Sequence, residues 1–255
     1  FAGDAVRGTE MRGQNKLKLV TRCRPGASYE QLNVLEYTAY RLYNEITPLS
    51  FRVRPARVTY RDTDRNRRED TQFNFLIEDD SDMARRNGRL VPLQVPTGEV
   101  RSSQLDPEAT AVYTLFQYMI GNLDWDAVNG HPGDDCCHNS KFVAATAETR
   151  TNVRPVPYDF DFSGFVNAPY ATPPEGIELP NIRTRLYRGY CRYNDQLPAA
   201  IALFQSRRAA ILAVVDNETR LTDASRRYAR GYLEGFFDII DDPDRVQRAL
   251  IDRCR

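Results

Sequence analysis

Alternating polar and apolar positions predict three strands near the N-terminus. Residues 16–20 alternate with a period of two, which predicts a half-buried strand with Lys16 and Lys18 on one face. Residues 51–60 alternate in the same way, and an apolar run follows at 72–78 after a charged turn. We expect the second and third strands to pair as a hairpin.

Between the first and second strands the apolar spacing becomes helical. Ser28 is a candidate N-cap with Gln31 at the capping-box position, and the helix is expected to run to about Asn44, before Pro48. Its apolar stripe, which Glu36 borders, consists of Leu32, Leu35, Ala39 and Leu42. The order strand, helix, strand, strand is typical of a small antiparallel sheet covered by one helix.

The middle of the chain combines short elements with a candidate domain boundary. Residues 82–87 predict a short helix, and the stretch 89–103, which contains proline and glycine, is expected to be irregular and to form the boundary. Asp106-Pro107 has the pattern of an N-cap followed by proline at the first helical position, and this helix is expected to end at Gly121. Asp124 should therefore lie just past a helix C-terminus.

The remaining chain predicts one strand, a long loop and several helices. Residues 142–145 fit a short strand, and the proline-rich stretch 167–180 is expected to be loop. Helices are expected at 197–215, 222–240 and 244–254. We predict an α+β chain with a small antiparallel-sheet lobe over residues 1–88 and a mainly helical lobe over residues 89–255, although length alone permits one large domain or two lobes.

Composition limits the classes of partner. The chain has 255 residues, of which 41% are hydrophobic and 27% charged, as in an ordinary globular protein. No run approaches the roughly 18 apolar residues of a membrane span, so we expect none. With 35 basic and 35 acidic residues the formal net charge is zero, so no global field attracts nucleic acid and we expect no such partner. The arginines of 65–68 are flanked by acids and fit a solvated turn.

Cysteine usage favours an oxidising compartment. The chain has five cysteines without CxxC spacing, which is more than a reduced cytosolic protein needs. We expect one or two disulfides, with a connectivity that the sequence does not reveal, and an extracytoplasmic location. The sequence opens at Phe1 without an initiator methionine, which fits a processed or trimmed chain and leaves open whether a signal peptide was removed.

The most informative stretch runs from Gly121 to Gly164. Asp124, Asn139, Asp159 and Asp161 occur there on two loop-like segments separated by the expected strand at 142–145. Carboxylate and carboxamide oxygens brought together at strand ends suit Mg²⁺ with phosphate oxygens, whereas zinc favours more histidine and cysteine.

Two metal-related alternatives match this stretch only in part. Residues 159–164 imitate the start of a helix-loop-helix calcium loop, but the twelfth position is Tyr170 instead of the required glutamate. The DxD pattern is also found in phosphohydrolases, where it opens a doubly wound α/β domain that the helical C-terminal region does not supply.

The histidines and adjacent cysteines suggest two further alternatives. Cys136-Cys137-His138 contains zinc-ligand residue types, although adjacent cysteines rarely bind one tetrahedral ion. His131 and His138 are the only histidines, so a nucleophilic hydrolase would need one of them, and no nucleophile lies at a recognisable elbow.

Three segments resemble the spore-coat protein H (CotH) kinases and, more distantly, the HipA-type kinases. They are Gly121-Asn122-Leu123-Asp124-Trp125, His138-Asn139 and Pro157-Tyr158-Asp159-Phe160-Asp161. The order of the preceding strands and helix is also similar to the CotH small lobe. The resemblance implies a two-lobed protein-kinase-like fold and transfer of phosphate from ATP, with Mg²⁺, to a protein hydroxyl.

The resemblance also implies a role for each matched residue. Asp124 would orient or deprotonate the acceptor hydroxyl, and Asn139, Asp159 and Asp161 would hold Mg²⁺. Lys18, or Lys16 on the same face, would neutralise the α- and β-phosphates, with Glu36 holding that lysine. The segment that ends in Glu78 would lie at the adenine-binding hinge.

Two departures from typical kinases keep other interpretations open. Asn139 follows Asp124 by fifteen residues, instead of about five, so the insert 127–135 must loop out. No glycine-rich phosphate loop precedes Lys16, as expected if the family lacks one or if upstream strands lie outside this sequence. The alternatives are a pseudokinase or binding module on the same scaffold, and a surface protein stabilised by disulfides.

Overall fold

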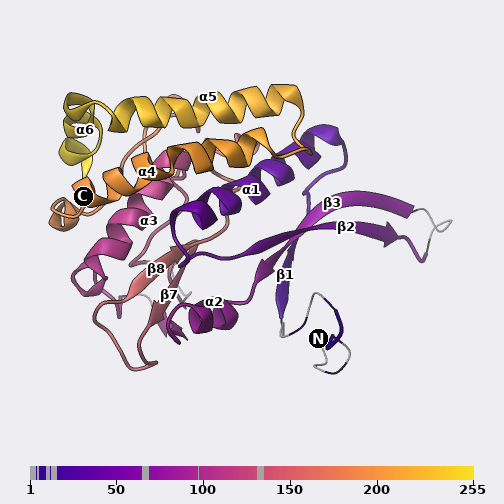
Figure 1. The fold of residues 1–255 in the computed structure, drawn as a ribbon, viewed down its shortest axis with the longest axis horizontal. Coiled ribbons are helices and arrows are strands. Elements are labelled where there is room, and N and C mark those ends of the chain that lie inside the picture. Colours follow the sequence, from indigo (N-terminus) through magenta and orange to yellow (C-terminus); the bar gives the residue numbers. More distant parts are fainter. Residues whose placement is uncertain are drawn as a thin grey trace.

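The computed structural model describes residues 4, 6–9, 12, 16–64, 69–96, 98–130 and 135–255, and the side chain of residue 135 is not described. The chain forms small antiparallel sheets and a set of helices, so the α+β prediction is confirmed (Figure 1). The arginine-rich turn at 65–68 and His131 lie outside the described residues.

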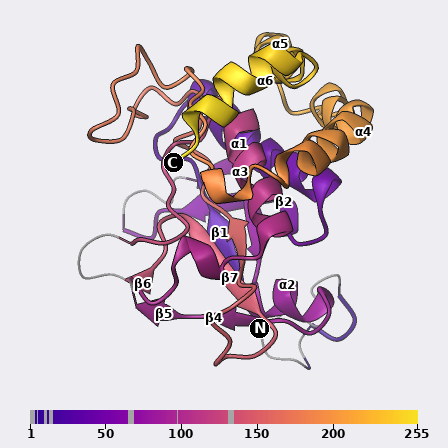
Figure 2. The same ribbon diagram turned by 90° about the vertical axis from the view of Figure 1, so that its left-hand side faces the viewer.

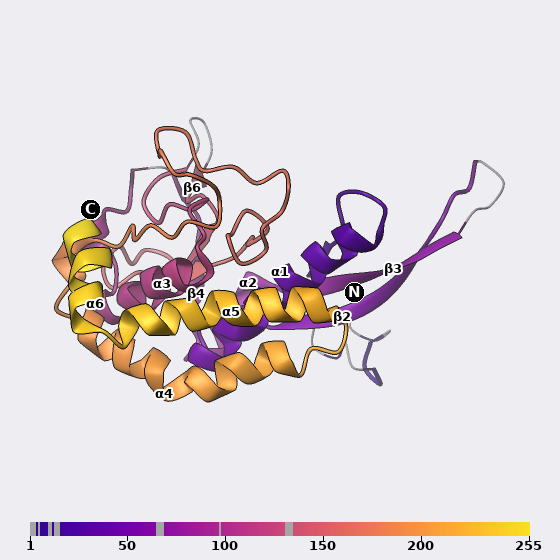
Figure 3. The same cartoon turned by 90° about the horizontal axis from the view of Figure 1, so that it is seen from above.

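The N-terminal sheet has the strand order β1-β3-β2. Its strands are β1 (Leu17–Val20), β2 (Val53–Arg61) and β3 (Glu69–Glu78). β2 and β3 form the expected hairpin, with Val53 opposite Ile77 and Arg61 opposite Glu69. The far end of this hairpin projects away from the helices in Figure 3. β1 adds to the other edge of β3, with Lys18 opposite Ile77.

Helix α1 (Ala27–Ile46) packs against this sheet and against the C-terminal helices. It begins one residue before Ser28, and its N-cap is Gly26, which makes no side-chain cap. The predicted Ser28 cap with Gln31 in a capping box is therefore wrong. Gln31 instead reaches a distant loop, where it donates to Arg220 O at 2.9 Å and accepts from Thr222 N at 2.8 Å.

The region expected to be irregular contains short strands. After α2 (Asp80–Arg86), β4 (Val91–Leu93) pairs with β7 (Ser140–Ala144), and β7 pairs with β8 (Arg154–Pro157). β5 (Val95–Pro96) pairs with β6 (Asp135–Cys136). The irregular assignment of 89–103 is thus wrong in part, because strands far along the sequence supply the partners that these short segments need.

The helical part follows the predicted pattern closely. The 3-10 turn η1 (Ser102–Gln104) precedes α3 (Pro107–Ile120), which has Asp106 as its N-cap and ends at Gly121. After a long loop and η2 (Cys191–Tyr193) come α4 (Leu197–Asp216) and α5 (Asp223–Ile240). The helix expected at 244–254 is instead α6 (Pro243–Ala249) followed by the 3-10 turn η3 (Ile251–Arg253).

One large hydrophobic cluster joins the sheet to the helices. It combines Phe75 on β3 and Tyr40 on α1 with Phe116 on α3 and Phe236 on α5, and it therefore includes residues on both sides of position 88. In Figure 1, α4 and α5 lie side by side along one face, with α1 and α3 beneath them, and Figure 2 shows these helices on one side of the β4 and β7 strands. A core shared in this way fixes α1 relative to the loops that follow α3 and β8.

Among the described residues, one helix, α4, is long and apolar enough by length and composition to cross a membrane. It packs against α1, α3 and α5, and it carries Arg207 and Arg208 near its middle. Length and composition alone are weak evidence for a span.

Candidate functional site

A cleft of about 240 Å³ lies between β1, α1 and the loop after β8. Four of the residues predicted from the sequence contribute to its lining: Lys18, Glu36, Asp159 and Asp161. Lys18 comes from β1, Glu36 from the middle of α1, and the two aspartates from the loop. Residues from three distant parts of the sequence therefore meet at one place.

The aspartate loop is held in place by an aromatic anchor. Phe160 is fully buried, with its ring centroid 4.5 Å from that of Tyr40 and 5.5 Å from that of Phe116. The Asp159 backbone adopts a left-handed φ of 64°, and its N–H donates to the Tyr40 hydroxyl at 2.8 Å. Because Phe160 points into the core, its neighbours Asp159 and Asp161 are directed to the cleft.

Negative charge is concentrated in the cleft. Glu36 is buried, and this burial, reinforced by Asp159 and Asp161, raises its pKa well above the usual value, while Lys18 acts in the opposite direction. Burial is the main reason that the pKa of Asp161 is raised to about 6, followed by Asp159 and, to a smaller extent, Asp124. The Tyr170 hydroxyl, which donates to Asp161 Oδ2 at 3.1 Å, acts in the opposite direction and lowers this pKa. The carboxylates thus repel one another, and a cation would relieve that repulsion.

Asp124 lies beside the cleft, on the loop that follows α3. Gly121 ends the helix in the left-handed conformation with a φ of 61°, and Asn122 Oδ1 accepts the Asp124 N–H at 3.0 Å. The Asn139 amide donates to the Asp124 carbonyl at 2.8 Å and to its Oδ2 at 3.0 Å. His138 Nε2 lies 2.6 Å from Asp124 Oδ1. Both carboxylate oxygens of Asp124 therefore have partners.

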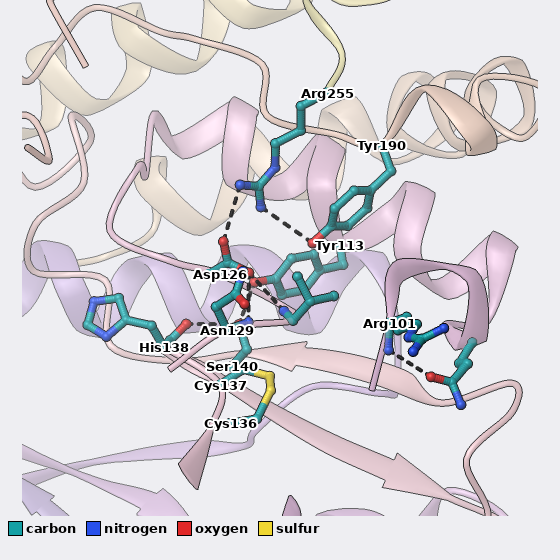
Figure 4. The surroundings of a disulfide bond; sticks show 12 residues. Arg101, Tyr113, Asp126, Asn129, Cys136, Cys137, His138, Ser140, Tyr190 and Arg255 are labelled. Atoms are coloured by element: carbon teal, nitrogen blue, oxygen red, sulfur yellow. Dashed lines mark hydrogen bonds and ion pairs between the residues drawn. A yellow bond between two sulfur atoms is a disulfide. The ribbon is translucent and has the colours of Figure 1, made fainter. Parts of the chain in front are cut away.

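The insert between Asp124 and Asn139 has closely spaced ends. Asp126 N donates to His138 O at 3.0 Å, and His138 N donates to Asn129 O at 2.9 Å (Figure 4). Asn139 O also accepts the Tyr158 N–H at 3.3 Å, which connects this loop to the aspartate loop. The wide spacing in sequence therefore does not separate Asp124 from Asn139, because the described residues at the two ends of the insert are bonded to each other.

Helix α5 supports both loops from behind. Gly164 N donates to Gly121 O at 3.0 Å, so the end of the aspartate loop is bonded to the start of the Asp124 loop. The Tyr232 hydroxyl packs against both glycines and donates to Arg183 O at 3.1 Å. Any side chain at either glycine would collide with Tyr232.

Four predicted residues do not line the cleft: Asp124 and Asn139, which form the bonded pair on the neighbouring loops, and Lys16 and Glu78. Lys16 is exposed and precedes β1, so Lys18 is the one of these two lysines that lines the cleft. The carboxylate of Glu78 is held by Arg86, with an Nη2–Oε2 distance of 2.9 Å, and accepts the Arg52 N–H at 3.0 Å. Glu78 therefore binds α2 and β2 together at this end of the sheet.

The donors in and beside the cleft fit magnesium better than zinc. Among the described residues, no group of three or more His, Cys, Asp or Glu side chains could hold a metal alone. Magnesium in phosphate-transfer sites usually takes one or two carboxylates, with phosphate oxygens and waters completing the shell. Asp159 and Asp161, with the Asn139 carboxamide nearby, supply that kind of donor.

The zinc alternative for Cys136-Cys137-His138 is excluded by a disulfide. Cys136 and Cys137 are bonded to each other (Figure 4), so neither offers a thiolate. Cys191 is bonded to Cys254, and Cys23 is free. The expectation of one or two disulfides is confirmed for the structure.

The Cys191–Cys254 bond holds the C-terminal residue against the Asp124 loop. Arg255 Nη1 lies 3.2 Å from Asp126 Oδ2, and Arg255 Nη2 lies 3.4 Å from the Tyr190 hydroxyl (Figure 4). Arg255 N also donates to Gly189 O at 2.8 Å. The chain terminus is therefore part of the support for this loop.

Sequence reasoning missed several polar residues around the cleft. His138 contacts Asp124, Tyr40 holds the Asp159 backbone, and Lys141 lies beside Tyr158. His138 was named in the His138-Asn139 segment of the resemblance without a role of its own, and the scarcity of lysine in an arginine-rich chain was the available signal for Lys141. Comparisons with protein-family models, curated proteins and solved structures find no match to this chain.

Proposed function

We propose that the chain is a CotH-like kinase that uses Mg²⁺ and ATP to phosphorylate a protein hydroxyl. The observation that carries the proposal is the single cleft lined by Lys18, Glu36 and the Asp159–Asp161 pair, with the bonded Asp124–Asn139 pair beside it. Positioning and electrostatics supply most of the catalysis of phosphoryl transfer, so a few acids, one amide and one lysine suffice.

Each residue has a defined role in this proposal. Lys18 neutralises the inner phosphates of ATP, and Glu36 draws the Lys18 amine towards α1. Asp159, Asp161 and Asn139 would hold Mg²⁺, which when bound neutralises charge on the phosphate oxygens. The raised pKa values of Glu36 and Asp161 support this assignment, since such a cluster of acids gains most from a bound cation.

Asp124 orients the acceptor. Its Oδ1 faces His138 and its Oδ2 faces Asn139, so the carboxylate has a fixed orientation. In the proposed reaction the acceptor hydroxyl displaces one of these partners and donates its hydrogen bond to the carboxylate. Contacts of this kind commonly rearrange when substrate binds.

The proposed fold is two-lobed, with a small lobe to about residue 88 and a larger helical lobe from 89 to 255. The three-stranded sheet with α1 corresponds to the small lobe. The cleft lies where β1 and α1 meet the loop after β8, which is where a nucleotide would sit between two such lobes. The Cys191–Cys254 disulfide supports the proposal of an extracytoplasmic location.

The direct test is transfer of the γ-phosphate from labelled ATP to a protein acceptor in the presence of Mg²⁺. We expect Asp124→Asn and Asp159→Asn each to lower the rate by about 100-fold or more, since general-base contributions alone reach 10²–10⁴. Asp238→Asn, an exposed change on α5, is the matched control and should retain the parent rate. Equal rates for all three variants would refute the proposal.

A nucleotide-binding module without transfer is the second candidate. It is favoured by one observation, the occupation of both Asp124 oxygens by His138 and Asn139. A thermal-shift titration with ATP, with and without Mg²⁺, separates the candidates when combined with the transfer assay. Stabilisation by Mg²⁺-ATP without any transfer would favour the binding module, and no stabilisation at millimolar ATP would exclude both.

A further inference from the structure

Two of the three lysines in the chain flank one aromatic ring. Lys18 Nζ lies 5.2 Å from the centroid of the Tyr158 ring, and Lys141 Nζ lies 5.3 Å from the same centroid. The two amines come from different sheets, because Lys18 is on β1 and Lys141 is on β7. The distance between them cannot exceed the sum of these two values.

Two ammonium groups held this close need an explanation. A cation near an aromatic face is attracted to it only weakly at an exposed site, and the repulsion between two like charges opposes that attraction. Within the part of the chain that the structure describes, neither amine takes part in an ion pair. A bound polyanion would be attracted to both amines and would remove their repulsion.

The position of Lys141 indicates which part of a polyanion it would meet. Lys141 lies two residues after Asn139, whose amide is bonded to Asp124, and its strand partner Val156 lies two residues before Tyr158. Lys141 is therefore on the side of the Asp124 loop, whereas Lys18 is on the side of Glu36. In phosphoryl transfer the terminal phosphate must lie nearest the group that orients the acceptor.

We infer that Lys141 binds the terminal phosphoryl group of ATP, opposite Lys18 on the inner phosphates. This inference rests on the proposed kinase function and adds a catalytic residue to it. In the transfer, the acceptor oxygen bonds to the terminal phosphorus while the bond from that phosphorus to the bridging oxygen breaks, and its electron pair leaves with ADP. The hydroxyl proton passes to Asp124, and Lys141 neutralises the non-bridging oxygens without changing any covalent bond.

The test compares Lys141→Ala and Lys141→Arg with the parent chain, using ATP and ADP in the presence of Mg²⁺. Arg248→Ala removes one exposed positive charge on α6 and is the matched control. A charge-assisted contact corresponds to a change of about 10- to 100-fold. We expect Lys141→Ala to weaken ATP binding by that factor, to change ADP binding less than about threefold, and to slow transfer, while Lys141→Arg retains most of the ATP affinity.

The outcomes separate the two proposals. If the parent binds and transfers but Lys141→Ala keeps the parent's preference for ATP over ADP, as Arg248→Ala should, the role of Lys141 is refuted and the kinase function stands. If the parent neither binds Mg²⁺-ATP nor transfers phosphate, the kinase function is refuted and the role of Lys141 with it. Lys141 is exposed, so these variants should fold like the parent.

Discussion

Replacing Gly164 by alanine tests whether α5 holds the two candidate loops together. An added Cβ would lie 2.8 Å from the Ile182 carbonyl oxygen and 3.0 Å from the Arg183 Cα, and closer still to the Tyr232 hydroxyl. The first two atoms belong to the backbone, so they cannot be relieved by a rotamer change. The loop that carries Asp159 and Asp161 would have to move instead.

The cost can be estimated from overpacking. Inserting a methyl group into a well-packed site typically costs 1–3 kcal/mol, and fixed backbone neighbours place Gly164→Ala at about 2–3 kcal/mol. For a chain of this size a loss of 1 kcal/mol lowers the melting temperature by roughly 2–4 °C. We therefore expect a decrease of about 4–12 °C, together with weaker binding of Mg²⁺-ATP.

Thermal unfolding followed by circular dichroism measures this decrease, and Gly231→Ala is the matched control. Gly231 lies next to Tyr232 on α5, and a Cβ there meets nothing within 4 Å. Alanine in a helix interior is favoured over glycine by roughly 0.5–1 kcal/mol, so this variant should be more stable than the parent. A Gly164→Ala variant as stable as the parent would refute the close packing of Ile182, Arg183 and Tyr232 against Gly164.

Three further predictions concern charge, backbone support and the disulfide. Burial raises the folded-state pKa of Asp161 from the ordinary value of 3.8 to about 6, so its contribution to stability is present below pH 3.8 and is lost as the pH rises through 6. Asp161→Asn should therefore increase the free energy of unfolding more at pH 7.5 than at pH 4, by about 1–2 kcal/mol after allowance for partial exposure. An equal effect at both pH values in chemical denaturation would contradict this. Tyr40→Phe should destabilise the chain by about 1–3 kcal/mol because the N–H of Asp159 loses its acceptor, and chemical denaturation that detects no change would argue against this bond. Reduction of the Cys191–Cys254 bond, which closes a separation of 63 residues, should cost about 4 kcal/mol on the loop-entropy model, and thermal melts with and without reductant measure it.

Local sequence patterns predicted most of the fold that positions the site. The Asp106-Pro107 start and the Gly121 end of α3 follow from capping chemistry that neighbouring residues determine. The alternation in residues 51–60 and the apolar run at 72–78, separated by a charged turn, predicted the β2–β3 hairpin from local pattern as well. The Ser28 cap was predicted wrongly because its expected partner, Gln31, accepts a hydrogen bond from Thr222 N on a distant loop instead. A contact between distant segments has no local sequence pattern.

The site was predictable where one segment carries its chemistry and was missed where contacts join distant segments. Asp159 and Asp161 stand out because Phe160 between them must be buried, which directs both carboxylates the other way. The pairing of His138 with Asp124 and of Lys141 with Tyr158 depends on how the insert closes and on the β7–β8 register. Neither feature has a periodic pattern in the sequence.

Calorimetric titration with ATP, in the presence and absence of Mg²⁺, is the most direct test of the central claim that the cleft binds a magnesium nucleotide. The critical variant is Asp159→Asn, because asparagine tolerates the left-handed backbone found there and should leave the fold intact. We predict that the parent binds ATP only with Mg²⁺ and that Asp159→Asn weakens this binding by about tenfold or more, while the surface variant Asp238→Asn binds like the parent. Equal binding by the parent and Asp159→Asn, or no binding by the parent, would contradict the claim.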